Sequence, residues 1–187
     1  MEQSVTIFQE KFSTGQVIKA AGISNATLQS WMKRDVISGE REDKIEGGGS
    51  PGRYRSFGFH TLMEIAVAKA MIDAGVKDLS NAFKAARGFA YTGTEQTELY
   101  PERNPSLPFS NRGKLLGRTL LAAADDKSHV AFWQSGADAL ADIRQALGQP
   151  EGFAMVFINE VFDRVMASLN HHPEEVLEAA YGADTNA

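Results

Sequence analysis

The sequence predicts an α+β fold, in which an N-terminal helix-turn-helix is followed by a small α/β unit. Two short stretches with apolar residues at helical spacing lie on either side of Gly22. Beyond a proline-containing stretch, two runs of β-forming residues flank a turn, and amphipathic helical patterns then return. These observations predict an N-terminal domain over residues 1–90, a linker or long loop over 91–112, and a C-terminal α/β domain over 113–187.

The overall composition is typical of a globular protein. The chain has 187 residues, of which 43% are hydrophobic and 23% are charged. Cysteine is absent, which excludes disulfides, thiolate metal ligands and a cysteine nucleophile, and which fits a reducing compartment. The N-terminal residues show no signal-peptide pattern, and no stretch of about 18 apolar residues occurs. We therefore expect a cytoplasmic protein that makes no membrane contact.

The two N-terminal helices have recognisable ends. Ser13 or Thr14 can cap the first helix, because a side-chain hydroxyl accepts hydrogen bonds from the free backbone N–H groups of a first turn. Gly22 can adopt the positive φ of a tight helix exit. Ser24 or Asn25 can cap the second helix in the same way. Two helices of this length, joined by a short glycine-containing turn, are a helix-turn-helix candidate.

A polar, glycine-rich stretch follows the second helix, and we interpret it as a loop. The motif "RYRSF" comes next and can form one arm of a small β-hairpin, with the other arm beginning within residues 36–38. From Phe59 the apolar residues return to helical spacing as far as Gly75. Asp78 or Ser80 can then start another helix.

The expected C-terminal unit contains a β-hairpin, a helix, a strand and a second helix, in that order. The hairpin turns at Asp125 and Asp126, and the helix after it ends at Gly148. The next apolar run predicts a strand over residues 154–158 that continues into a helix, with Asn159 at the junction. Five aromatic residues of this unit can line a ligand cavity, belong to the core or form a dimer face: Phe132, Trp133, Phe153, Phe157 and Phe162.

Two segments, taken in order, resemble a known family. They are "GQVIKAAGISNATLQSWMKRDVI" and "GRYRSFGFHTLMEIAVAKAMIDAGV". Residues 13 to about 87 resemble the winged helix-turn-helix DNA-binding domain of the MerR family. The resemblance implies a bacterial, sequence-specific transcription regulator that binds double-stranded DNA as a homodimer, with RNA polymerase as a further expected partner. Typical members continue into a long dimerisation helix near Tyr91, where this sequence has prolines and glycines. The C-terminal unit is therefore expected to self-associate or to sense a ligand.

The resemblance implies DNA contacts on the second helix and on the wing. A recognition helix fits the major groove and presents its first turns to base edges. Asn25 and Gln29 lie four residues apart on one helix face, and their amide side chains can pair with adenine. Gln29 stands where the family most often has arginine. The expected DNA-binding residues are Ser24, Asn25, Thr27, Gln29, Ser30, Lys33, Arg34, Arg53, Tyr54 and Arg55.

Other interpretations of these residues stay open. Asn25 can serve only as a helix cap, and Lys33 and Arg34 can belong to an ordinary solvated face. Leu28 and Trp31 are expected in the core. If the protein contacts a polyanion, the distribution of charge favours a contact through the N-terminal part of the chain alone. The first 60 residues contain eight Lys and Arg against seven Asp and Glu, whereas the whole chain has a net charge of -5.

The sequence offers little for an enzyme. His171 and His172 are adjacent, whereas metal ligands on one helix face need a spacing of three or four residues. Pro173 follows them and is a typical first residue of a helix. We expect no enzymatic activity and no cofactor. The alternatives to a regulator are a phage-type architectural DNA-binding protein, resembling an excisionase or a small terminase subunit, and a protein-interaction module that has lost DNA binding.

Overall fold

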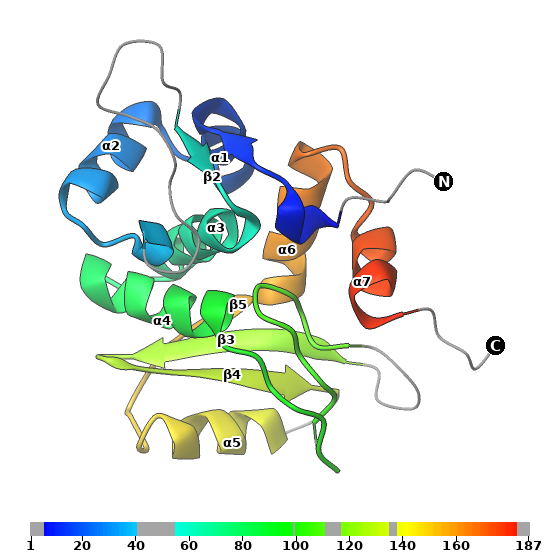
Figure 1. The fold of residues 1–187 in the computed structure, drawn as a ribbon. Helices are drawn as coiled ribbons and strands as arrows, with labels where there is room; N and C mark the ends of the chain where they lie inside the picture. Colours follow the sequence, from blue (N-terminus) through cyan, green and yellow to red (C-terminus); the bar gives the residue numbers. More distant parts are fainter. Residues whose placement is uncertain (1–5, 41–54, 99, 111–116, 135–137, 183–187) are drawn as a thin grey trace.

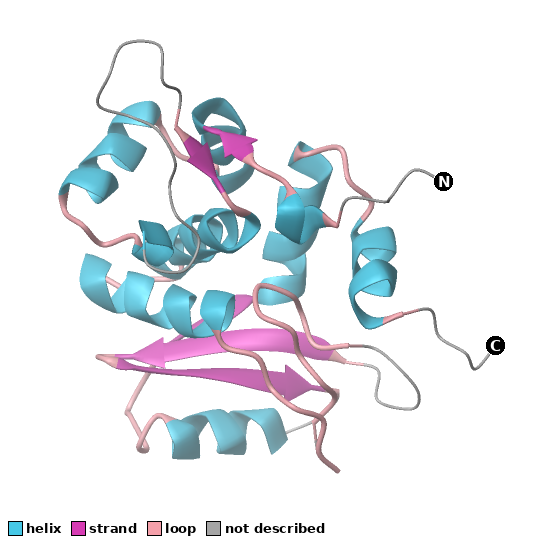
Figure 2. Cartoon of the chain, in the orientation of Figure 1, coloured by secondary structure: helices cyan, strands magenta, loops and turns pink. Residues whose placement is uncertain are grey.

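The computed structural model describes residues 6–40, 55–98, 100–110, 117–134 and 138–182. Within these ranges the chain forms seven α-helices and two small antiparallel sheets (Figures 1 and 2). The predicted α+β class is therefore confirmed. In the same ranges, no helix combines the length and the apolar character that a bilayer span requires.

The N-terminal helix pair has the predicted ends. Helix α1 spans Thr14–Ala21 and α2 spans Asn25–Lys33. Ser13 caps α1 reciprocally with Gln16, whose side chain accepts from the Ser13 backbone N–H at 2.9 Å. Gly22 ends α1 with a φ of 66°. The cap of α2 is Ser24, whose hydroxyl accepts from the backbone N–H of Thr27 at 3.0 Å, and not Asn25, which is the first residue of the helix.

Replacing Gly22 with alanine is expected to destabilise the fold by about 1–2 kcal/mol, the cost of a left-handed backbone for an L-residue. Steric conflict is not the reason, because an added Cβ would lie 3.7 Å from its nearest neighbour, Nη1 of Arg164. Gly152→Ala is the matched control, since its added Cβ meets nothing within 4 Å and its φ lies outside the left-handed region. Urea denaturation measures both changes, and equal stability of the two variants would contradict this role for Gly22.

The predicted pairing of the "RYRSF" strand is wrong. Strand β2, Ser56–Phe57, pairs antiparallel with β1, Phe12–Ser13, which precedes α1. Residues 38–40 form a short 3-10 helix, η2, in place of the expected partner strand. Phe12 and Phe57 are partners in the β1–β2 register, and both side chains are fully buried. This pairing places two aromatic side chains in the core, which favours it over a free-standing hairpin.

Two longer helices form the centre of the molecule. Helix α3 spans Phe59–Asp73 and α4 spans Leu79–Tyr91, with Asp78 as the α4 cap. Buried residues occur on nearly every side of α3, as expected of a helix with neighbours all round it. It contacts α1, α4, α6 and β5. The predicted helix end at Gly75 is confirmed by its φ of 109°.

The second half follows the predicted order of hairpin, helix, strand and helix. Strands β3, Arg118–Ala124, and β4, Lys127–Trp133, form the hairpin, and β5, Ala154–Phe157, pairs with the other edge of β3. The helices are α5, Asp138–Ala146, α6, Ile158–Ser168, and α7, Pro173–Tyr181. Asn159 lies inside the first turn of α6, where its Oδ1 accepts from the Thr119 backbone N–H at 2.8 Å.

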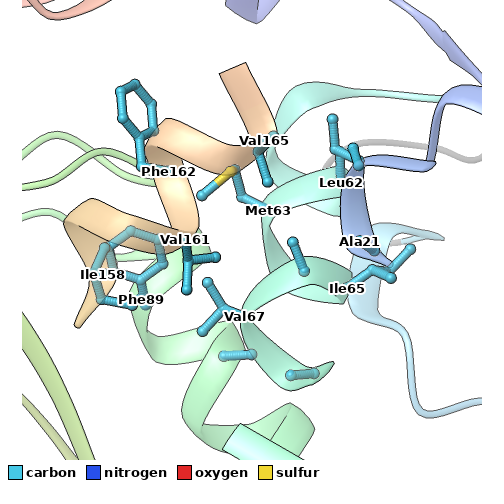
Figure 3. Packing of buried hydrophobic residues seen from close by; sticks show 14 of the residues in the cluster. Ala21, Leu62, Met63, Ile65, Val67, Phe89, Ile158, Val161, Phe162 and Val165 are labelled. Atoms are coloured by element: carbon cyan, nitrogen blue, oxygen red, sulfur yellow. The ribbon is translucent and has the colours of Figure 1, made fainter. Parts of the chain in front are cut away.

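One apolar core runs through both halves of the chain. Helices α3, α4 and α6 cover one face of the three-stranded sheet, and α5 covers the other (Figure 1). Met63 of α3 lies beside Val165 of α6 in this core, whereas Leu62 lies on the side of α3 that faces Ala21 of α1 (Figure 3). Arg164 of α6 also donates to the carbonyl oxygen of Ala20 in α1 at 2.7 Å. The core therefore crosses the boundary at which the sequence predicted a division into domains, and that division stays a prediction.

Candidate nucleic-acid interface

Helix α2 is anchored by its inner side. Leu28 is fully buried, and Trp31 is 7% exposed. The Trp31 ring meets Phe83 of α4 edge to face, with ring centroids 5.1 Å apart. Both residues are thus structural, as the sequence predicted. Because they fix one side of α2, they determine which residues face outward.

The outward side of α2 is polar. Asn25, Gln29 and Lys33 are exposed and follow one another at intervals of four residues, so they form one row along the helix. Ser24 is also exposed, but its hydroxyl lies 2.8 Å from that of Thr27. Ser24 and Thr27 are therefore engaged in the helix cap, whereas Asn25, Gln29 and Lys33 form an exposed polar row outside it.

Arg55 joins this row from a distant part of the sequence. It directly precedes β2, and its Nη1 donates to Oε1 of Gln29 at 2.9 Å and to Sδ of Met32 at 3.4 Å. Gln29 in turn donates through Nε2 to Oδ1 of Asn25 at 3.4 Å. The predicted contact residues Asn25, Gln29 and Arg55 are thus brought together. The other two expected wing residues, Arg53 and Tyr54, lie outside the described residues.

The electrostatics of this region differ from those of the whole chain. Lys33 and Arg34 are exposed, and neither forms an ion pair with any residue that the structure describes. Between residues 11 and 36 the sequence has four basic residues and one acidic residue, a local charge of +3, whereas the chain carries -5. Ser30, the remaining residue of the expected set, is half-buried on α2. The row therefore lies in a locally cationic setting.

The predicted aromatic and histidine groups have simpler roles. Phe162 is fully buried in the core, and Trp133, Phe153 and Phe157 line an apolar groove of about 160 Å³ beside α5. His171 hydrogen-bonds through Nε2 to Oε2 of Glu10 at 3.1 Å. Pro173 begins α7, as the sequence predicted. No group of three His, Asp or Glu residues within the described ranges is placed to share a metal ion.

A polar cluster that the sequence did not predict lies at the opposite end of α4 from the Trp31–Phe83 contact. It consists of Tyr100, Arg103, His129 and Asp142. These residues come from the loop after α4, from β4 and from α5, and no spacing in the sequence connects them. An arginine between Pro101 and Pro105, with a tyrosine directly before Pro101, was the available signal, since such residues are unusual in a purely connecting loop.

A scan against protein-family models finds no match to this chain, and a search of curated proteins finds no match either.

Proposed function

We propose that the chain is a sequence-specific DNA-binding transcription regulator, and that residues 13 to about 87 act as a MerR-like winged helix-turn-helix. The observation that carries the proposal is the hydrogen bond between Arg55 and Gln29. It joins the end of the expected wing to the exposed face of the expected recognition helix. A DNA duplex that contacts one of these side chains would meet the other as well.

In the proposed complex α2 enters the major groove and its polar row faces the bases. The carboxamide oxygen of Gln29 is bound to Arg55, so Gln29 presents its Nε2 donor to acceptors such as a purine N7. The guanidinium of Arg55 carries five N–H donors, which leaves donors for a phosphate while it orients Gln29. Lys33 and Arg34 add phosphate contacts that hold the helix in register.

The proposal is tested with Gln29→Ala and Arg55→Ala on a DNA site selected by the intact protein. Gln29→Ala is expected to cost about 1–3 kcal/mol of binding free energy and to relax specificity at one base pair. Arg55→Ala is expected to weaken binding to all sequences and to reduce the slope of affinity against salt by about one. The measurements are affinity titrations at several salt concentrations and selection from a random pool.

Arg144→Ala is the matched control, because Arg144 is exposed on α5, away from the proposed interface. It is expected to leave affinity and salt dependence unchanged. If Arg55→Ala and Arg144→Ala gave the same salt slope, the assignment of Arg55 to the DNA contact would be wrong. If the intact protein selected no DNA sequence, the proposed function itself would be wrong.

One observation favours the second candidate, an architectural DNA-binding protein of phage type. Helix α4 ends at Tyr91 and is closed by the loop that follows, where Arg103 Nη1 donates to the Phe89 carbonyl at 3.0 Å and Ser106 Oγ donates to the Ala90 carbonyl at 3.0 Å. A long dimerisation helix does not continue from this point. Homodimerisation, and contact with RNA polymerase, are part of the regulator proposal and require another surface. Genomic footprinting separates the candidates: promoter sites support the regulator, and attachment or packaging sites support the architectural protein.

A further inference from the structure

An open cavity lined in part by polar side chains lies between the end of α4, the loop after it, β4 and α5. Its volume is about 400 Å³, which is within the range of small-molecule sites, about 300–1,000 Å³. Backbone from Gly88 and Gly93 contributes to the wall, and Phe109 and Val130 are its apolar members. Its polar side chains include Thr94, Tyr100, Arg103, Ser128, His129 and Asp142.

Arg103 is the least expected of these side chains, because it is only 3% exposed. Its Nη1 donates to the carbonyl of Phe89 at 3.0 Å, and its Nη2 donates to the carbonyl of Thr92. Its Nε is buried and has no hydrogen-bond partner among the described residues. The rings of Phe89 and Phe109 lie 5.1 and 5.9 Å from its guanidinium carbon.

The charge of Arg103 is not neutralised by a carboxylate of any residue that the structure describes. Burial lowers the pKa of its guanidinium to about 10, so the group remains charged at neutral pH. A buried cation without an anionic partner is costly, and an anion bound nearby would offset that cost. Arg103 therefore favours an anionic occupant for the cavity that it lines.

The acidic residue of the cavity is already occupied by its own neighbours. Asp142 Oδ2 accepts from the Tyr100 hydroxyl at 2.5 Å and lies 2.9 Å from Nε2 of His129. Burial, together with the hydrogen bond to Asp142, raises the pKa of Tyr100 to about 12, which keeps this hydroxyl a donor. Asp142 is thus held by two partners and does not compensate Arg103.

Hydrogen-bond donors at the rim have no such partners. The hydroxyls of Thr92, Thr94 and Ser128 line the same cavity, and all three residues are exposed. None of them forms a side-chain hydrogen bond with a residue that the structure describes. Neutral hydroxyl donors beside a fixed positive charge suit an oxyanion, because each oxygen can accept one or two hydrogen bonds.

We propose that this cavity binds a small molecule through a carboxylate or phosphate group, with Arg103 supplying the charge and Thr94 and Ser128 supplying hydrogen bonds. The site belongs to the second half of the chain and does not depend on whether α2 binds DNA. The apolar surface of Phe109 and Val130 would contact the body of the ligand. An organic acid and a phosphate compound both carry an oxyanion that these groups could bind.

The test titrates the full-length protein with sodium benzoate, sodium phosphate and benzamide at constant ionic strength. Amide chemical shifts of Thr94, Ser128 and His129 are followed by nuclear magnetic resonance. We expect saturable shifts with at least one of the two anions and none with benzamide, which matches benzoate in shape but lacks the charge. Benzoate and phosphate separate a carboxylate preference from a phosphate preference.

The contribution of the hydroxyls is tested with the double substitution Thr94→Val and Ser128→Ala. Arg103 is left in place, because it also holds the loop against the end of α4 and its removal would disturb the fold. Loss of two neutral hydrogen bonds is expected to weaken anion binding about tenfold. Ser80→Ala, an exposed serine on α4 that does not line the cavity, is the control and is expected to bind as the unaltered protein does. Non-saturating shifts, equal binding of benzamide, or unchanged affinity in the double variant would each overturn the proposal.

Discussion

Phe162→Ala is expected to lower the free energy of unfolding by about 3–5 kcal/mol, which is a large part of the stability of a typical domain. The ring is fully buried on α6 and belongs to the continuous core, on the side of α6 that faces away from α3 (Figure 3). Removing it leaves a cavity that the surrounding helices cannot fill by a small movement. Urea denaturation followed by circular dichroism and by tryptophan fluorescence measures the change.

The same experiment tests whether the two halves are one cooperative unit. Since the core is continuous, the two probes are expected to report coincident transitions in the unaltered protein and in the variant. Leu140→Ala on α5 is the control, because Leu140 is 54% exposed and its loss should change stability by about 0.5 kcal/mol or less. A separate early transition of the C-terminal half would show that the core is not shared. An equal loss of stability in both variants would contradict the expected contribution of the Phe162 ring.

Replacing Glu64 gives the second large effect. This residue of α3 is fully buried, and its two carboxylate oxygens accept from the backbone N–H of Ser38 at 3.0 and 3.1 Å. Oε2 also accepts from the Tyr91 hydroxyl at 3.1 Å. Glu64→Ala is expected to cost about 2–4 kcal/mol, because the partly buried Ser38 N–H loses its acceptor and the Tyr91 hydroxyl loses one of its hydrogen bonds. Glu64→Gln keeps an acceptor in place and is expected to cost much less than Glu64→Ala.

The pH dependence of these variants has a definite sign. Burial raises the pKa of Glu64 above its ordinary value of 4.5, despite the opposing hydrogen bonds from Ser38 and Tyr91. The folded state therefore binds the proton more tightly than the unfolded state, so this contribution to stability is complete below pH 4.5 and is lost as pH rises through the raised pKa. Glu64→Gln should gain stability relative to the unaltered protein over that interval. Urea midpoints from pH 4 to 8 measure this, and a constant difference would contradict the raised pKa.

Helical periodicity and capping residues predicted most of the fold. Ser13 and Asp78 cap the starts of their helices and Gly22 ends α1, as predicted. These positions could be predicted because helix ends are determined by residues next to one another in sequence. The β1–β2 pairing was not predicted, since strands of two residues are too short to show alternation. The burial of Phe12 against the rest of the core, which selects that pairing, depends on contacts between distant parts of the chain.

For the candidate sites too, the sequence predicted the features that depend on neighbouring residues and missed those that depend on distant ones. The exposed row of α2 followed from the sequence, because the positions of Leu28 and Trp31 indicate which side of the helix faces inward. The contact between Arg55 and Gln29 did not follow, since it joins α2 to a residue 26 positions further along the chain, directly before β2. The cavity around Arg103 was missed for a related reason: its polar residues are brought together only when the loop after α4 packs against the sheet.

The contact between Trp31 and Phe83 gives the protein an intrinsic optical reporter on α2. The chain has two tryptophans, and the other, Trp133, lies at the end of β4 with its ring centroid 6.4 Å from that of Phe157. One fluorophore therefore lies on the helix proposed to read DNA, and the other lies beside α5 in the second half. Quenching and emission wavelength can then be assigned to a place in the molecule without attaching a dye. Movements of α2 on binding can thus be followed separately from changes at the sheet.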